Sequence, residues 1–174
     1  MLQKQVQKKR LKLNFKLNHS PDVALFSFSK KREFFTPDQQ QLMVESIKKA
    51  EKNTSGEIRV FVEGKCTFVD AVDRAQEIFF SLKMDQTKDR NAVLFYLAMD
   101  DRQLALFADE GIYKRVGAAY WNEEVKKIVR AFTKDDYTGG ICSVIENIGL
   151  ALQKEFPYES DDKNELPDEI IFGN

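Results

Sequence analysis

The residues with the clearest chemical potential are carboxylates placed where an apolar strand should end. Asp109 and Glu110 interrupt the stretch "LALFADEGI", residues 104–112, and Gly111 follows them directly. Carboxylates and backbone carbonyls that converge beside a glycine can bind a hard cation such as Ca²⁺, which takes roughly 6 to 8 oxygen ligands. Two interpretations stay open at this point: a solvated polar turn, or one part of a cation site.

Sheet direction decides which other side chains can join Asp109. If the strands that begin near Glu57 and Asn91 are parallel and the next strand returns, all three residues lie at one edge of the sheet. Asp100 and Asp101 then lie at the opposite edge, in a tight turn where aspartate is common for backbone reasons. Ligands of open α/β sheets favour that opposite edge. We nevertheless expect the site at the first edge, because the strand ending at Asp109 gives way to a helix beside a glycine.

Covalent and histidine-based catalysis are disfavoured by this sequence. Its single histidine, His19, lies in a basic N-terminal stretch. Neither Cys66 nor Cys142 has the arginine six positions on that cysteine phosphatase chemistry needs, and both are expected to be reduced thiols. No G-x-x-x-x-G-K-[ST] phosphate loop and no contiguous EF-hand calcium loop occurs. Metal-assisted hydrolysis, in which a carboxylate-bound cation orients water, is the remaining route to catalysis.

The composition is that of one globular domain. The chain has 174 residues, of which 43% are hydrophobic and 14 are phenylalanine. No apolar run approaches the roughly 18 residues that suggest a membrane span, and no signal peptide is recognisable. We therefore expect a cytoplasmic, monomeric protein without a membrane span.

Charge divides the chain into three parts. Residues 1–32 hold nine Lys or Arg against one Asp, whereas residues 155–174 hold seven Asp or Glu against one Lys. We predict a flexible basic arm over residues 1–33, a folded domain over residues 34–157 and a flexible acidic tail over residues 158–174. The arm has no aromatic platform or helix-turn-helix pattern, so it gives no strong evidence for nucleic acid binding.

Hydrophobic periodicity predicts the elements of the folded domain. Thr36, Pro37 and Gln39 are typical of a helix start, with an N-cap, a first-turn proline and a capping-box glutamine. Alternation over residues 57–63 predicts a strand, and the continuous apolar run 92–99 predicts a central strand covered on both faces. The other predicted elements are a helix over 68–82, a returning strand over 103–108, and helices over 121–132 and 141–152.

This order of elements indicates the fold class. A strand, a helix and a second strand form a right-handed crossover with the two strands parallel. The short turn at residues 100–102 then brings the third strand back antiparallel. We predict an α/β fold, a three-layer α/β/α sandwich with a small mixed sheet.

Four segments, in order along the chain, resemble the TPM domain family. They are "TSGEIRVFVE" (54–63), "FFSLKMDQTKDRNAVLFYLA" (79–98), "FADEGI" (107–112), and "YWNEEVKKIVRAF" (120–132) followed by "DDYTGGI" (135–141). The resemblance covers roughly residues 34–157. It extends to bacterial TPM-domain proteins and to thylakoid-lumen proteins linked to photosystem II repair.

The resemblance implies an α/β/α sandwich with an acidic crevice that binds Ca²⁺, with Mg²⁺ as the alternative ion. Asp109 and Gly111 match the acid and the last glycine of a family turn, and Asn91 matches the family's asparagine before the central strand. Asp136 takes the acidic position before the last helix, with Asp135 beside it. Together with the acid from the sheet argument, the predicted metal ligands are Asp109, Asp136, Asp135, Glu57 and Asn91.

The resemblance also implies a function. Family members include assembly and auxiliary factors, and an acid phosphatase activity has been proposed for thylakoid members. We therefore expect a divalent-cation-binding interaction or assembly module that acts on an unidentified protein partner through the acidic crevice. The alternative is a weak metal-assisted acid phosphatase.

Overall fold

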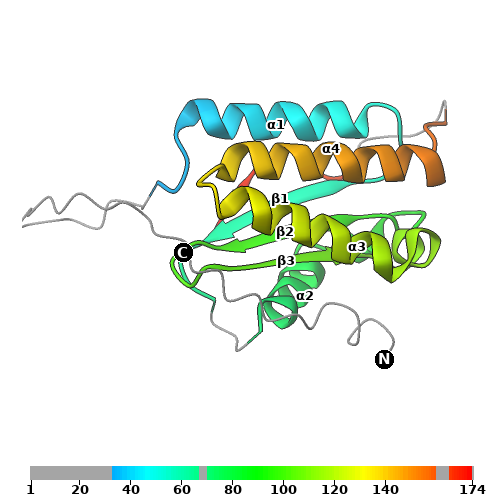
Figure 1. The fold of residues 1–174 in the computed structure, drawn as a ribbon. Coiled ribbons are helices and arrows are strands. Elements are labelled where there is room, and N and C mark those ends of the chain that lie inside the picture. Colours follow the sequence, from blue (N-terminus) through cyan, green and yellow to red (C-terminus); the bar gives the residue numbers. More distant parts are fainter. Residues whose placement is uncertain (1–32, 67–69, 160–164, 174) are drawn as a thin grey trace, which may run out of the picture.

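The computed structural model describes residues 33–66, 70–159 and 165–173 (Figure 1). Almost all of the predicted basic arm therefore lies outside the described residues. The elements are α1 (Pro37–Glu51), β1 (Ile58–Glu63), α2 (Ala71–Ser81), the 3-10 helix η2 (Met84–Gln86), β2 (Val93–Ala98), β3 (Gln103–Ala108), α3 (Glu110–Phe132), α4 (Tyr137–Glu155) and β4 (Ile171–Phe172).

The sheet has the mixed topology that the sequence predicts. Its strand order is β3-β2-β1-β4. β1 and β2 run parallel, with Ile58 opposite Val93, and β3 returns antiparallel to β2, with Ala108 opposite Val93. The starts of β1 and β2 and the end of β3 therefore share one edge, which we call the starting edge.

Helices cover both faces of the sheet, as expected for a three-layer sandwich (Figure 1). α1, α3 and α4 lie on one face, where their apolar side chains pack with Val60 and Val62 of β1. α2 lies on the other face and packs with Phe61 and with Tyr96 of β2. Every residue of β1 and β2 is buried, which explains the apolar composition of β2, whereas β1 also buries Arg59 and Glu63. In the described ranges, no helix has the length and apolar character needed to cross a bilayer.

Helix ends follow the local sequence signals. At α1, Thr36 and Gln39 form the predicted capping box, in which each side chain accepts a hydrogen bond from the other residue's backbone N–H. α3 begins at Glu110, earlier than its apolar stripe from Trp121 indicates, and is kinked at Gly117, where φ is 78°. Trp121, at the start of that stripe, is buried in the core.

The acidic tail contributes a strand that was not predicted. Residues 165–173 lie against the domain, and Ile171–Phe172 forms β4, a parallel neighbour of β1. The position of these residues on the sheet edge was not predicted, and the flexibility expected of the tail stays a prediction. Charged residues are frequent in the tail, yet apolar side chains such as Leu166 and Phe172 pack on the core clusters.

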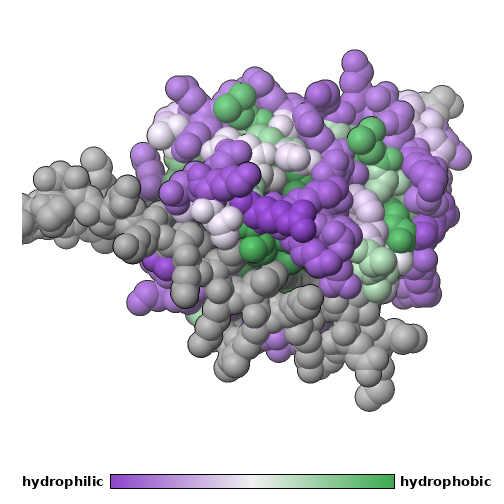
Figure 2. Space-filling model, viewed as in Figure 1, coloured by the Kyte–Doolittle hydropathy of each residue, from purple (hydrophilic) through white to green (hydrophobic). Residues whose placement is uncertain are grey.

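The outer surface of the helices is mainly polar. Figure 2 shows the face viewed in Figure 1, where hydrophilic residues predominate and apolar ones form separate spots. The large apolar side chains exposed among the described residues are Leu42, Phe80, Leu150 and Tyr158. Isolated apolar residues of this kind are normal on soluble domains.

Candidate functional site

Asp109 anchors the start of α3 rather than standing free at the starting edge. Its carboxylate is 1% exposed and accepts two hydrogen bonds from Arg90, Nε to Oδ2 at 2.7 Å and Nη2 to Oδ1 at 2.8 Å. Oδ1 also accepts the backbone N–H of Glu110 at 2.7 Å, as an N-cap. Both oxygens are therefore occupied by donors of the protein, and a cation would have to displace Arg90.

Gly111 lets the loop before β2 pack closely on the first turn of α3. Its N–H donates to the carbonyl of Arg90 at 2.8 Å. A Cβ at this position would lie 2.3 Å from the carbonyl oxygen of Asp89 and 2.6 Å from that of Arg90. The glycine is required by this close approach, and the predicted convergence of backbone and carboxylates beside Gly111 is present.

Glu57 contributes a buried carboxylate at the same edge. It is 3% exposed, and its Oε1 accepts the backbone N–H of Glu165 at 2.7 Å. Its Oε2 is buried and makes no hydrogen bond of normal geometry among the described residues, although the backbone N–H of Leu166 also acts on this carboxylate. Burial is the main reason why the pKa of Glu57 rises to about 7.

Asn91 lies on the segment next to Glu57, two residues before Val93, whose backbone N–H donates to the Glu57 carbonyl at 2.8 Å. The Asn91 side chain is 1% exposed, and its Nδ2 donates to Ser55 Oγ at 3.1 Å. Ser55 Oγ in turn donates to Asp89 Oδ2 at 3.3 Å. The Asn91 Oδ1 atom is buried and lacks a partner within the described part of the chain.

Asp135 and Asp136 lie elsewhere. α3 leads away from the starting edge, so the turn between α3 and α4 lies at the opposite end of the sheet (Figure 1). There Asp136 caps α4 by accepting the Gly139 N–H at 3.0 Å, and Asp135 accepts the Tyr137 hydroxyl at 3.2 Å. The expectation that Asp136 neighbours Asp109 was wrong, and these two acids cannot share an ion with the residues of the starting edge.

The structure thus brings together Glu57, Asn91 and Asp109 of the five predicted ligands. Within the described ranges, no group of three or more His, Cys, Asp or Glu side chains is placed to hold a metal ion. A cation site at the starting edge would have to combine carboxylate oxygen with amide, hydroxyl or backbone carbonyl oxygen. Calcium accepts such mixed sets.

A second charged group at the edge was missed by sequence reasoning. Glu51, at the end of α1, accepts the backbone N–H of Ile58 at 2.6 Å and interacts with the side chain of Asp168 in the tail. Arg59 of β1 is 7% exposed and lies in the field of both acids. These residues come from three distant segments, and no spacing in the sequence connects them.

Burial of Glu51 gives the domain a pH-dependent stability. Desolvation raises the pKa of Glu51 from 4.5 to about 9. The folded state therefore holds this proton more tightly than the unfolded state, so the free energy of unfolding should fall as pH rises from about 4.5 to about 9. In Glu51→Gln the amide stays neutral and can still accept from Ile58, so the decline should be shallower. Urea unfolding at pH 5, 7 and 9 measures this difference.

The control for this experiment is Glu45→Gln, which changes an exposed acid on the same helix. It should leave the pH dependence of wild-type unfolding unchanged. Equal pH slopes for wild type and Glu51→Gln would show that Glu51 does not retain its proton in the folded protein.

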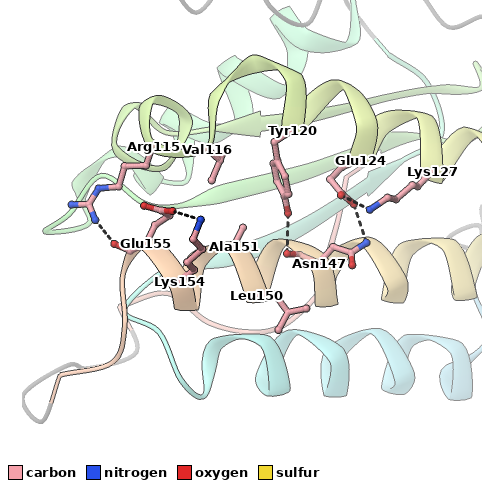
Figure 3. A pocket seen from close by; sticks show the side chains of 10 residues that line it. All are labelled: Arg115, Val116, Tyr120, Glu124, Lys127, Asn147, Leu150, Ala151, Lys154 and Glu155. Carbon is pink, nitrogen blue, oxygen red and sulfur yellow. Dashed lines mark hydrogen bonds and ion pairs between the residues drawn. The ribbon is translucent and has the colours of Figure 1, made fainter.

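A separate groove of about 420 Å³ lies between α3 and α4 (Figure 3). Tyr120 donates its hydroxyl to the Asn147 carbonyl at 2.9 Å, and the buried Glu124 accepts from Lys127 at 2.7 Å and from Asn147 at 3.0 Å. The polar groups along the groove are thus largely bonded to one another. We assign no ligand to it.

Comparison with known proteins supports the fold. The sequence model of the TPM domain matches residues 29–151. No curated protein sequence gives a significant match. The chain is similar to the BA42 protein from the psychrophilic bacterium Bizionia argentinensis, solved by NMR, with 41% identity and a TM-score of 0.76 over 83% of this chain and 99% of that one.

A more distant structure shares the fold alone. The N-terminal domain of the cg2496 protein from Corynebacterium glutamicum is 13% identical, with a TM-score of 0.53 over 80% of this chain and 93% of that domain. The α/β/α sandwich is therefore retained where little of the sequence is.

Proposed function

Because the chain belongs to the TPM domain family, we propose that it is an interaction module that binds a divalent cation of the calcium type at the starting edge. One observation carries this proposal: two of the buried oxygens that lack a hydrogen-bond partner within the described residues, Glu57 Oε2 and Asn91 Oδ1, belong to residues that precede adjacent parallel strands. Buried acceptors in native proteins are nearly always satisfied, and those that are not commonly contact water or an ion.

The chemistry of these groups suits a hard cation. Glu57 supplies a carboxylate oxygen and Asn91 an amide oxygen, and two hydrogen bonds through Ser55 link Asn91 to Asp89. A cation would offset the cost of burying Glu57 as a charged group, which is the cause of its raised pKa. Asp109 acts indirectly, because its pairing with Arg90 and α3 fixes the loop that carries Asp89 and Asn91.

Binding is proposed rather than catalysis. The acids Asp109 and Asp136 are engaged as helix caps, and Glu63 is engaged by Arg74 with Nη2 2.8 Å from Oε2. No feature of the described residues favours a metal-assisted phosphatase over cation binding.

Calorimetric titration with CaCl₂ tests the proposal. Wild type should bind one Ca²⁺, and Glu57→Gln and Asn91→Ala should each weaken the affinity at least about tenfold, a loss of roughly 1.4 kcal/mol. A parallel titration with MgCl₂ compares the two ions. The matched control is Asp136→Asn, which keeps an N-cap at the other end of the sheet and should leave the affinity unchanged. Binding that survives Glu57→Gln but is lost in Asp136→Asn would refute the proposed site.

A further inference from the structure

The outer edge of β1 is occupied by the chain's own C-terminal segment. Residues 165–173 run alongside β1, starting where Glu165 donates its N–H to Glu57. Ladder pairing follows at Phe61 with Ile171 and at Val62 with Phe172, and the Gly173 N–H donates to the Val62 carbonyl at 2.8 Å. An extended segment is thus added to the edge of a sheet, as in peptide recognition by strand addition.

Side chains of the segment alternate between the two faces of the sheet. Ile170 and Phe172 pack against the core cluster beneath α1, α3 and α4, whereas Ile171 packs against the cluster beneath α2. Position 173 accepts only glycine without rearrangement, since a Cβ there would lie 2.9 Å from Phe61 Cε1 and 3.0 Å from Glu63 Cβ. The edge therefore selects an apolar, alternating sequence followed by glycine.

The charge of Arg59 favours acidic residues just before the apolar part of the segment. Arg59 is 7% exposed, and the acids that act on it electrostatically are Glu51 and Glu57 of the domain together with Asp168 and Glu169 of the segment. The Nε of Arg59 has no hydrogen-bond partner among the described residues. A buried cation is stable only when anions compensate it, so the edge favours a segment with acids just before the apolar residues.

The segment pairs with the edge of β1 over only a short stretch. β4 comprises two residues, and the described residues of the tail are half-buried or exposed. Segments with few buried contacts open at low free-energy cost. β1, by contrast, is buried throughout and keeps its pairing with β2 over six residue pairs, Ile58 to Glu63. The edge would therefore persist if the tail left it.

We propose that the outer edge of β1 is a peptide-binding site for an extended segment of a partner protein, in which two acidic residues precede an aliphatic-aromatic stretch and a glycine. The segment 165–173, "ELPDEIIFG", carries this pattern and occupies the site in cis, so it competes with the partner. The site lies on the outer edge of β1. It shares Glu57 with the proposed cation site, because the Glu165 N–H donates to that carboxylate, but it does not require the cation.

Fluorescence anisotropy with a labelled peptide of residues 165–173 tests this site on the full chain. Ile171→Asp should release the tail, and Phe172→Asp serves as a second variant if the first does not fold. The released variant should bind the peptide at least tenfold more tightly than wild type, whose tethered tail competes at a high effective concentration. Adding Arg59→Gln to the released variant should weaken binding at least fivefold, as should Asp168→Asn with Glu169→Gln in the peptide.

Three results would overturn the proposal. The first is equally weak binding to wild type and to both released variants, with their folds verified by circular dichroism. The second is affinity that does not change in Arg59→Gln or with a peptide carrying Gly173→Val. The third is a concentration-dependent dimer of wild type, seen by sedimentation and abolished by Ile171→Asp, because the occupant would then be a second copy of this chain.

Discussion

Replacing Arg90 with alanine should lower the free energy of unfolding by about 2–3 kcal/mol. Breaking a buried ion pair costs roughly 3–5 kcal/mol because it leaves an uncompensated charge. The Asp109 carboxylate is buried, but the side chain of Arg90 is 46% exposed, so water can replace part of the lost interaction and the expected cost is smaller. Urea unfolding monitored by circular dichroism measures the change.

Lys83→Ala is the matched control for Arg90→Ala. Both residues have a left-handed backbone, with φ of 56° at Lys83 and 53° at Arg90, so both substitutions carry the same backbone cost. Lys83 is exposed, and its replacement should change stability by less than about 0.5 kcal/mol. Equal effects of the two variants would show that Arg90 contributes its backbone conformation and not its bond to Asp109.

Gly111→Ala should cost about 2 kcal/mol and displace the loop that carries Asp89 and Asn91. The added Cβ would meet two backbone carbonyl oxygens, at 2.3 and 2.6 Å, which cannot turn away as a side chain can. Overpacking costs up to about 3 kcal/mol, whereas alanine gains only about 1 kcal/mol over glycine in a helix. The cost of the clash therefore exceeds the gain in helix propensity, and Gly111→Ala should lower stability.

Gly64→Ala separates this clash from the general effect of removing a glycine. Its Cβ would approach the Asp100 carboxylate to 3.0 Å, and that side chain can move aside. Thermal unfolding should show Gly64→Ala close to wild type, within about 0.5 kcal/mol. If Gly111→Ala were equally mild, the close packing of the loop against α3 would not hold.

Much of the fold could be predicted because its signals are local. The capping box at Thr36 and the alternation in β1 depend on residues that are neighbours in sequence, and both are confirmed. β4 was not predicted, because its two residues are too few to show a period. Its position depends on pairing with the outer edge of β1, which becomes visible only in three dimensions.

The candidate site could be predicted only in part. Strand direction correctly gathered Glu57, Asn91 and Asp109 at one edge. It could not show that Arg90 turns back onto Asp109, since this depends on a left-handed backbone at a non-glycine residue. Asp136 was grouped with these residues by the family resemblance and not by strand direction. α3 continues for 15 residues beyond Gly117, and at 1.5 Å per residue this separates its ends by more than roughly 20 Å.

The most direct test of the cation site is a CaCl₂ titration of the ¹⁵N-labelled full chain, followed residue by residue by NMR. Saturable shifts are expected for the backbone amides of residues 55–58 and 89–92, which surround Glu57 and Asn91. The amides of residues 135–137, at the other end of the sheet, should not move. Shifts confined to residues 135–137, or an unchanged spectrum at millimolar calcium, would contradict a cation site at the starting edge.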